Sequence, residues 1–232
     1  GPGYTTTPTF SLLQFPAGEP HVKVLHENDG KGPLTEVATV TGCEAIDLVA
    51  LSMWADACHQ RGARTVVVMP YLPGARADRG LPFGASVYAS IINAMKVDRL
   101  VCFDPHSPVM PALLDNLVVI DSAAVVRREV IGRADSDSRA QRYDGIIAPD
   151  AGAVQRAQRV ASACHLPLYR ALKHRGPQTG KFSGFSCEPL PATGRFLVVD
   201  DICDGGGTFV GLAEATGLPR ERLGLWVSHG VF

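Results

Sequence analysis

The chain has 232 residues, of which 46% are hydrophobic and 19% charged, and its 22 Lys and Arg against 23 Asp and Glu leave a net charge of −1. This composition excludes disordered, collagen-like and coiled-coil proteins. A charge so near zero gives no general attraction to nucleic acid or to an anionic membrane, so we expect neither as a partner. The length allows one large domain or two small ones.

The six cysteines form no C-x-x-C pair and are scattered through apolar segments, a usage typical of reduced thiols in a cytosolic protein. The sequence has no apolar run of the ~20 residues that a membrane helix needs. Its first residues lack the basic and apolar regions of a secretory signal. These features predict a cytoplasmic protein without membrane attachment.

Apolar residues at helical spacing alternate along the chain with β-branched runs that are typical of strands buried on both faces. Gly62 is expected to end the first helix as a C-terminal cap. In chain order the pattern predicts a helix over 44–60, a strand over 64–70, a helix over 85–95, strands over 99–104 and 118–121, a helix over 123–131, a strand over 144–149, a helix over 153–164, strands over 166–172 and 195–200, a helix over 208–216 and a strand over 222–228.

This alternation predicts an α/β fold of two tandem parallel sheets with helices on both faces. The pattern runs twice with a break near Asn116, so we expect an N-terminal domain over 4–116 and a C-terminal domain over 117–232. The polar segment 133–142 is expected to be a solvated connection. Segment 175–191 lacks periodicity, which predicts a long structureless loop that is functional or mobile.

The segment 196–208 carries the most specific pattern in the sequence, in which a buried strand leads into carboxylates, then glycines, then a helix. Glycines let the backbone approach an anion closely, and a helix N-terminus offers free N–H groups. The pattern predicts a phosphate cradle beside carboxylates suited to sugar hydroxyls or to the waters of Mg²⁺. A glycine-rich turn with a capping Asp is the alternative. In order, the residues are Asp200, Asp201, Asp204, Gly205, Gly206, Gly207 and Thr208.

This segment resembles the ribose-phosphate loop of the phosphoribosyltransferase fold, which reads D-D-x-x-D-T-G/C-G-T, with Gly205 in place of the Thr. Further segments resemble motifs of the ribose-phosphate pyrophosphokinase (PRPP synthetase) family, in family order and over most of the chain. They are 15–22 (F-x-x-G-E-x-x-V), 70–79 (P-Y-x-x-Y-A-R-Q-D-R, with Ala77 in place of Gln), 104–107 (D-L-H-x), 149–156 (P-D-x-G-x-x-x-R), 173–175 (K-x-R) and 229–232 (H-G-x-F).

Several of these residues also have an interpretation from their chemistry alone. The guanidinium groups of Arg76 and Arg79, after a strand and a proline-rich turn, suit a polyphosphate; a solvated surface turn is the alternative. His106 follows a strand-ending Asp and suits a metal or a phosphate, with a structural role as the alternative.

Asp150 follows a buried strand and suits Mg²⁺ or a sugar hydroxyl, with helix capping as the alternative. Lys173 and Arg175 stand where the long loop opens. Two cations there suit the spreading charge of a transferring phosphoryl group, and a charged strand end is the alternative.

The resemblance implies an enzyme that transfers the diphosphoryl group of ATP to the anomeric hydroxyl of ribose 5-phosphate, with Mg²⁺ as cofactor, small molecules as substrates and a homo-oligomer of two or more subunits. It implies that Lys173 and Arg175 act in catalysis and that His106 and Asp150 organise the metal. The implied ATP-binding residues are Phe15, Glu19, Arg76, Asp78, Arg79 and His106. The implied ribose-phosphate residues are Asp200, Asp201, Asp204, Gly205, Gly206, Gly207 and Thr208.

Three other functions stay open on the sequence. Gly205 in place of Thr leaves room for an acceptor with a larger 5-substituent, such as ADP-ribose. A type I phosphoribosyltransferase would consume PRPP, and the Arg76 and Arg79 motif argues against it. A non-catalytic regulatory relative would bind nucleotide or a partner synthetase, and the presence of Lys173 and Arg175 argues against that.

Overall fold

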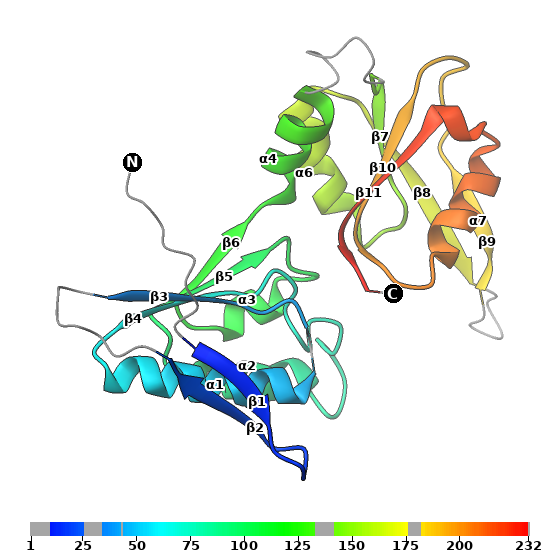
Figure 1. Cartoon of the computed structure of the whole chain (residues 1–232). Coiled ribbons are helices and arrows are strands. Elements are labelled where there is room, and N and C mark those ends of the chain that lie inside the picture. The colour runs from blue at the N-terminus through cyan, green and yellow to red at the C-terminus, as the bar shows by residue number, and fades with distance from the viewer. Residues whose placement is uncertain (1–9, 26–33, 43, 133–141, 176–181, 232) are drawn as a thin grey trace. The chain divides into compact units, whose positions relative to one another are not determined.

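The structure is a computed structural model and describes residues 10–25, 34–42, 44–132, 142–175 and 182–231. The chain divides into two compact units, Gly1–Ile120 and Asp121–Phe232, which Figure 1 colours from blue to green and from green to red. The division falls after Ile120 rather than at the predicted residue 116. The reason is that the strand after Asn116 pairs with the first sheet.

The N-terminal unit contains a four-stranded parallel sheet of order β3-β4-β5-β6 and a separate antiparallel hairpin, β1-β2. The helices and strands expected between residues 44 and 121 are present, and the sequence pattern does not predict β1, β2, β3 or α3. The strands are β1 Phe10–Gln14, β2 Pro20–Val24, β3 Thr35–Thr39, β4 Arg64–Val68, β5 Arg99–Phe103 and β6 Leu117–Ile120, and the helices are α1 Ala45–Gln60, α2 Gly84–Ala94 and α3 Val109–Leu113.

One apolar core joins the helices of this unit to its sheet. Val67 and Leu100, on the two central strands, are buried in the same cluster as Trp54 of α1. Gly62 follows α1 with a φ of +68°, so the predicted cap is confirmed. Because β4 and β5 are parallel, the loops that follow them leave the same edge of the sheet.

The C-terminal unit is built on a five-stranded sheet of order β11-β10-β7-β8-β9. All neighbouring strands are parallel except β9, an edge strand that runs antiparallel to β8. The predicted helix over 123–131 forms as a short α-helix and a π-helix. The elements are α4 Ser122–Val125, η1 Val126–Ile131, β7 Gly145–Ala148, α6 Val154–Cys164, β8 Leu168–Arg175, β9 Phe182–Cys187, β10 Phe196–Cys203, α7 Gly207–Thr216, η2 Arg220–Arg222 and β11 Leu223–Gly230.

The expected structureless loop over 175–191 contains β9 instead. Pairing with β8 gives the backbone of β9 its hydrogen-bond partners, although the strand has no alternation of apolar and polar residues. Residues 176–181 of this segment, like 133–141 of the expected solvated connection, lie outside the described residues.

The sheet of this unit has a separate core on each face. Leu197 and Val199 of β10 face the cluster that contains Val160 of α6. Phe196 and Val198 face the opposite cluster, which contains Leu212 of α7. Because successive strand residues point to opposite faces, the apolar run of β10 fills both cores, and helices cover both sides as predicted.

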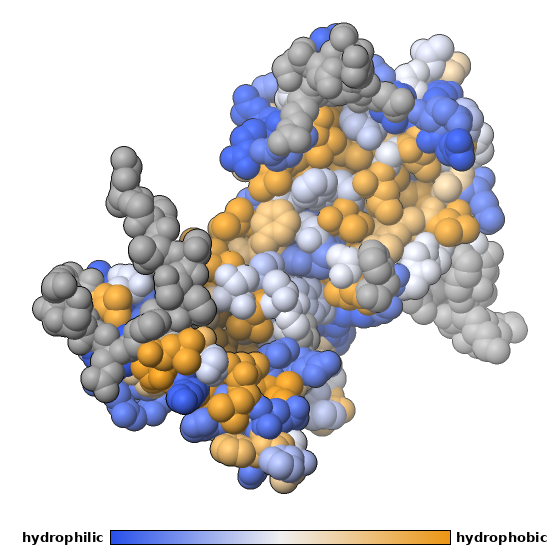
Figure 2. Space-filling view, viewed as in Figure 1, coloured by the Kyte–Doolittle hydropathy of each residue, from blue (hydrophilic) through white to orange (hydrophobic). Residues whose placement is uncertain are grey.

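No helix of the described residues is long and apolar enough to cross a membrane. Apolar and charged residues are mixed over the face of the molecule seen in Figure 2. Exposed apolar residues at a spacing of four lie along α2 and its N-cap, where Phe83, Val87 and Ile91 are 37%, 55% and 43% exposed. Residues four apart share one face of a helix.

Candidate active site

Strand β10 places two adjacent carboxylates near its carboxyl end. It lies between the parallel strands β11 and β7, so Asp200 and Asp201 are held by a strand with neighbours on both sides. Both are largely withdrawn from water, with 15% and 7% of their side chains exposed. The Asp201 N–H donates to Asp200 Oδ1 at 2.9 Å.

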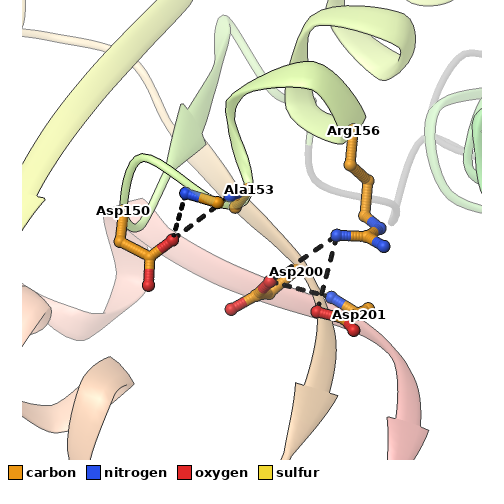
Figure 3. A network of polar contacts seen from close by, with 6 residues as sticks. Asp150, Ala153, Arg156, Asp200 and Asp201 are labelled. Atoms are coloured by element: carbon orange, nitrogen blue, oxygen red, sulfur yellow. Dashed lines mark hydrogen bonds and ion pairs between the residues drawn. The ribbon is translucent and has the colours of Figure 1, made fainter. Parts of the chain in front are cut away.

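Arg156 binds this acidic pair from helix α6, as Figure 3 shows. Its Nη1 lies 3.4 Å from Asp201 Oδ1 and 3.9 Å from Asp200 Oδ1, and its side chain is 6% exposed. The motif analysis includes Arg156 but gives it no role. The sequence does contain a clue to its role: Arg156 is a charged residue on the otherwise apolar helix face formed by Ala153, Ala157 and Val160.

Asp150 holds the turn that leads into α6. Its Oδ1 accepts hydrogen bonds from the N–H groups of Gly152 at 2.9 Å and Ala153 at 3.2 Å. Asp150 therefore stabilises the turn before α6, whereas the N-cap residue of the helix itself is Ala153 and has no side-chain cap hydrogen bond. The role of Asp150 toward a metal stays a prediction.

Burial, together with the neighbouring carboxyl groups of Asp201 and Asp150, raises the pKa of Asp200 to about 7. Arg156 brings one guanidinium group to two carboxyl groups. Carboxyl oxygens held side by side in this way fit a divalent cation or the hydroxyl groups of a sugar.

The raised pKa predicts a stability that depends on pH. The folded state keeps Asp200 protonated up to about pH 7, whereas the unfolded chain loses this proton near the usual carboxyl pKa of about 3.9. The native state binds more protons in between, so the contribution of Asp200 to stability falls as the pH rises from about 4 to about 7. Asp200→Asn removes this loss because asparagine does not titrate. We therefore expect the Tm of the variant minus the Tm of wild type to be several degrees larger at about pH 8 than at about pH 5.

The control is Asp98→Asn in the other unit. Hydrogen bonds from the backbone and side chain of Thr65 hold the pKa of Asp98 below its usual value. Asp98 is then ionised in both states over the tested range, so its Tm difference should not change with pH. A pH-independent difference for Asp200→Asn, measured by thermal unfolding in metal-free buffer, would contradict the raised pKa.

The glycine segment after β10 forms an open loop at the N-terminus of α7. Gly206 has a φ of +73° and precedes the helix, which begins at Gly207. An added Cβ at Gly205, Gly206 or Gly207 would meet no atom within 4 Å. Because the first turn of a helix leaves N–H groups without intrahelical partners, this loop suits the phosphate predicted for it.

Lys173 reaches this loop from strand β8. Its Nζ lies 3.5 Å from the Thr208 hydroxyl and 5.8 Å from the centre of the Phe185 ring. Arg175 ends β8, and its side chain lies outside the described part of the chain. One of the two predicted catalytic cations is therefore brought to the predicted phosphate loop.

In the N-terminal unit, Asp78 ties the loop after β4 to the loop after β5. Its side chain is 6% exposed and accepts a hydrogen bond from Arg79 Nε at 3.2 Å. Burial alone would raise the pKa of Asp78, but hydrogen bonds from Ser107 and Arg79 and the charges of Arg79 and His106 outweigh it and lower the pKa. The structure thus joins the predicted motifs around Asp78 and His106, and Arg76 is exposed in the same loop as Asp78.

Phe15 and Glu19 lie in another element of this unit, the turn between β1 and β2. The Phe15 N–H donates to the Glu19 carbonyl at 2.8 Å. The Phe15 ring is 47% exposed, and its centre lies 5.7 Å from that of His21. An exposed aromatic ring suits stacking on a base, but the ATP contact of both residues stays a prediction, as does the metal role of His106 and Asp150 together.

The chain has clear relatives. A ribose-phosphate pyrophosphokinase of Methanopyrus kandleri is 31% identical over 212 residues, which are 87% of this chain and 68% of the relative. One of Thermococcus kodakarensis is 28% identical over 230 residues, 95% of this chain and 77% of the relative. Among solved structures, phosphoribosylpyrophosphate synthetase from Mycobacterium smegmatis matches with a TM-score of 0.74 and 22% identity, over 96% of this chain and 72% of that one. No protein-family model matches.

Two parallel α/β units, an acidic pair and an open glycine loop at a helix N-terminus define a protein of the phosphoribosyltransferase fold. The solved-structure match has this architecture over nearly the whole chain. Within this fold, the similarity to the Methanopyrus kandleri relative identifies the family: the chain belongs to the ribose-phosphate pyrophosphokinase family. The family and the fold predicted from the motifs are confirmed.

Proposed function

We propose that the chain transfers the diphosphoryl group of ATP to the anomeric hydroxyl of ribose 5-phosphate, giving PRPP and AMP. The observation that carries this proposal is the site in the C-terminal unit, where an acidic pair bound by Arg156 precedes an open glycine loop and Lys173 reaches the helix behind it. The curated relatives bear the name of this activity. In the reaction, a bond forms between the anomeric oxygen and the β-phosphorus as the bond from that phosphorus to the oxygen of AMP breaks.

In this proposal the C-terminal unit binds the sugar. Asp200 and Asp201 accept hydrogen bonds from the 2- and 3-hydroxyls of ribose, a role that suits two adjacent carboxyl groups at the end of a buried strand. The N–H groups of the glycine loop and the hydroxyl of Thr208 hold the 5-phosphate, with Asp204 at the start of the loop. No atom lies within 4 Å of a Cβ built at any of the three glycines, so the backbone of this loop is open to a ligand.

The N-terminal unit binds ATP. Arg76 and Arg79 suit the polyphosphate, and both are exposed at the edge where β4 and β5 end. Asp78, buried between Arg79 and Ser107, orients this loop. Phe15 and Glu19 suit the adenine and ribose of the nucleotide.

Mg²⁺, when bound, would supply positive charge that neutralises the polyphosphate and polarises the β-phosphorus. The residues that would contribute to holding it are His106 in the N-terminal unit and, in the C-terminal unit, Asp150 with Asp200 and Asp201 beside the sugar. Among the described residues, no three His, Cys, Asp or Glu side chains gather into a group that could hold a metal. Mg²⁺ commonly takes one or two carboxylates together with water and substrate phosphates, so such a group is not needed.

An AMP-release assay tests the proposed function. We expect ATP and ribose 5-phosphate to yield AMP and PRPP in equal amounts by ³¹P NMR, and excess chelator to abolish the reaction. AMP release with ADP-ribose but not with ribose 5-phosphate would favour the larger acceptor. Consumption of PRPP with a base but without AMP release would indicate a phosphoribosyltransferase, and no turnover in any arm would indicate a regulatory relative.

Gly205→Thr is expected to improve the binding of ribose 5-phosphate. Nothing within 4 Å opposes a side chain at 205, and the φ of this residue is not in the left-handed region. The added hydroxyl donates to the 5-phosphate, and a hydrogen bond to a charged group changes affinity about tenfold. We therefore expect a lower KM for ribose 5-phosphate with kcat nearly unchanged.

Gly206→Thr is the matched control in the same loop. Its φ of +73° strains a β-branched residue, so this variant should raise KM and lower Tm. A higher KM for ribose 5-phosphate in Gly205→Thr, with ADP-ribose weakened still more, would mean that the loop is open for a larger 5-substituent.

A homo-oligomer and a cytoplasmic location complete the proposal. The exposed stripe of Phe83, Val87 and Ile91 on α2 supports an interface between subunits, because α2 carries no charged residue. The described cysteines, among them buried Cys58 and Cys102, form no disulfide, which supports a reducing compartment. Light scattering after gel filtration should give a mass of at least twice 24.7 kDa.

A further inference from the structure

Lys173 and Phe185 are a cross-strand pair in the β8–β9 arm, the antiparallel hairpin formed by these two strands. Residues directly opposite in an antiparallel pair project to the same face of the sheet. The Lys173 ammonium group accordingly lies over the Phe185 ring, 5.8 Å from its centre. The attraction between a cation and an aromatic face favours this position for an otherwise flexible side chain.

The Phe185 ring is seated against helix α7 at Gly211. Strand β9 packs on α7, and a Cβ added at Gly211 would lie only 2.6 and 2.7 Å from ring atoms Cε2 and Cδ2 of Phe185. The φ of Gly211 is not in the left-handed region, so its backbone does not require glycine, and glycine weakens a helix interior relative to alanine. The position of the Phe185 ring therefore explains why residue 211 is glycine, since any larger side chain would overlap the ring.

Thr208 and Gly211 stand three residues apart in α7 and so share one face of the helix. The ring sits at Gly211, and the ammonium group above the ring lies 3.5 Å from the Thr208 hydroxyl. One side of α7 thus contacts the Phe185 ring at Gly211 and the Lys173 ammonium group at Thr208, next to the open glycine loop.

We propose that Phe185, seated at Gly211, is a positioning residue that aims Lys173 at the phosphate loop. This inference rests on the proposed function, in which Lys173 acts on the transferring diphosphoryl group. Holding the cation in place before the reaction removes the need to order it in the transition state, and small displacements of such a group reduce the rate.

The first test is Phe185→Leu, which keeps an apolar side chain but removes the aromatic face. We expect kcat to fall about tenfold, with the KM values for ATP and ribose 5-phosphate within about twofold, because Lys173 acts in the transition state. In the Lys173→Ala background the same change should cause no further loss. Wild-type kcat in Phe185→Leu, or an equal further loss without Lys173, overturns the proposal.

Ser186→Ala is the matched control on the neighbouring residue of β9. The Ser186 hydroxyl lies 2.7 Å from His174 Nε2, on the face of the arm opposite to Lys173. If Phe185 acted only by holding the arm together, this variant would lose kcat as well. We expect it to stay within about twofold of wild type, and a loss equal to that of Phe185→Leu overturns the proposal.

Gly211→Ala tests the seat of the ring from the other side. In wild type the new methyl group displaces the ring, so kcat should fall about tenfold and Tm should drop. In the Phe185→Leu background we expect no further loss of kcat and a higher Tm, because alanine then only improves the helix. Additive effects on kcat and Tm would show that the two residues do not act together.

The readouts separate this inference from the proposed function. If wild type releases no AMP, the proposed function fails. The Tm values of Gly211→Ala, Phe185→Leu and the double variant still test whether the Phe185 ring packs against Gly211. If wild type is active and Lys173→Ala is inactive while Phe185→Leu keeps wild-type kcat, only the positioning role fails.

Discussion

Lys173→Ala is expected to lower kcat about a thousandfold or more while ATP binding stays within a few-fold, because a cation that acts on a transferring phosphoryl group contributes on that scale. The structure brings the Lys173 ammonium group to the N-terminus of α7, 3.5 Å from the Thr208 hydroxyl. There it lies beside the loop proposed to hold the acceptor. Its charge matters most when negative charge spreads over the diphosphoryl group, which is why kcat should change more than ATP affinity.

Arg170→Ala provides a control on the same strand. Arg170 is an exposed cation of β8, and it projects to the opposite face from Lys173 because the two are an odd number of residues apart. We expect its kcat within about threefold of wild type. Single-turnover measurement of AMP release, together with ATP binding by calorimetry, separates the chemical step from affinity. Wild-type turnover in Lys173→Ala would remove the residue from catalysis.

Arg156→Met is expected to lower the free energy of unfolding by about 3–5 kcal/mol at neutral pH, the usual cost of removing one partner from a buried ion pair. Methionine keeps much of the volume, so the loss comes from leaving Asp200 and Asp201 together without the guanidinium group 3.4 Å from Asp201. Because burial already raises the pKa of Asp200 to about 7, protonation relieves part of this repulsion in acid. The loss should therefore be smaller at about pH 5 than at about pH 8.

Arg159→Met is the matched control on the same helix. Arg159 pairs with Asp121 at 2.9 Å, but its side chain is 47% exposed, and exposed ion pairs contribute about 0–1 kcal/mol. Denaturant unfolding of both variants at the two pH values gives the comparison. Equal losses for Arg156→Met and Arg159→Met, or a loss that grows in acid, would contradict the proposed role of Arg156 in holding the acidic pair.

Most strands and helices of this protein follow from local patterns. The apolar run before Asp200 predicts a strand buried on both faces, and β10 indeed fills both cores of its sheet. The glycines after it predict a loop at a helix N-terminus, and α7 begins at Gly207. Each of these features depends on neighbouring residues, whose backbone preferences and spacing are readable along the chain.

By itself the sequence determined the alternation of strands and helices, the motifs of the family and the loop between β10 and α7, because these depend on residues close together in the chain. Only the tertiary structure decided that β9 is a strand, since its stability comes from pairing with β8 and not from its own composition. Only folding brings Arg156 to Asp201 and seats Phe185 against Gly211. The raised pKa of Asp200 likewise follows from burial beside Asp201, and burial is a property of the packed chain that no local pattern contains.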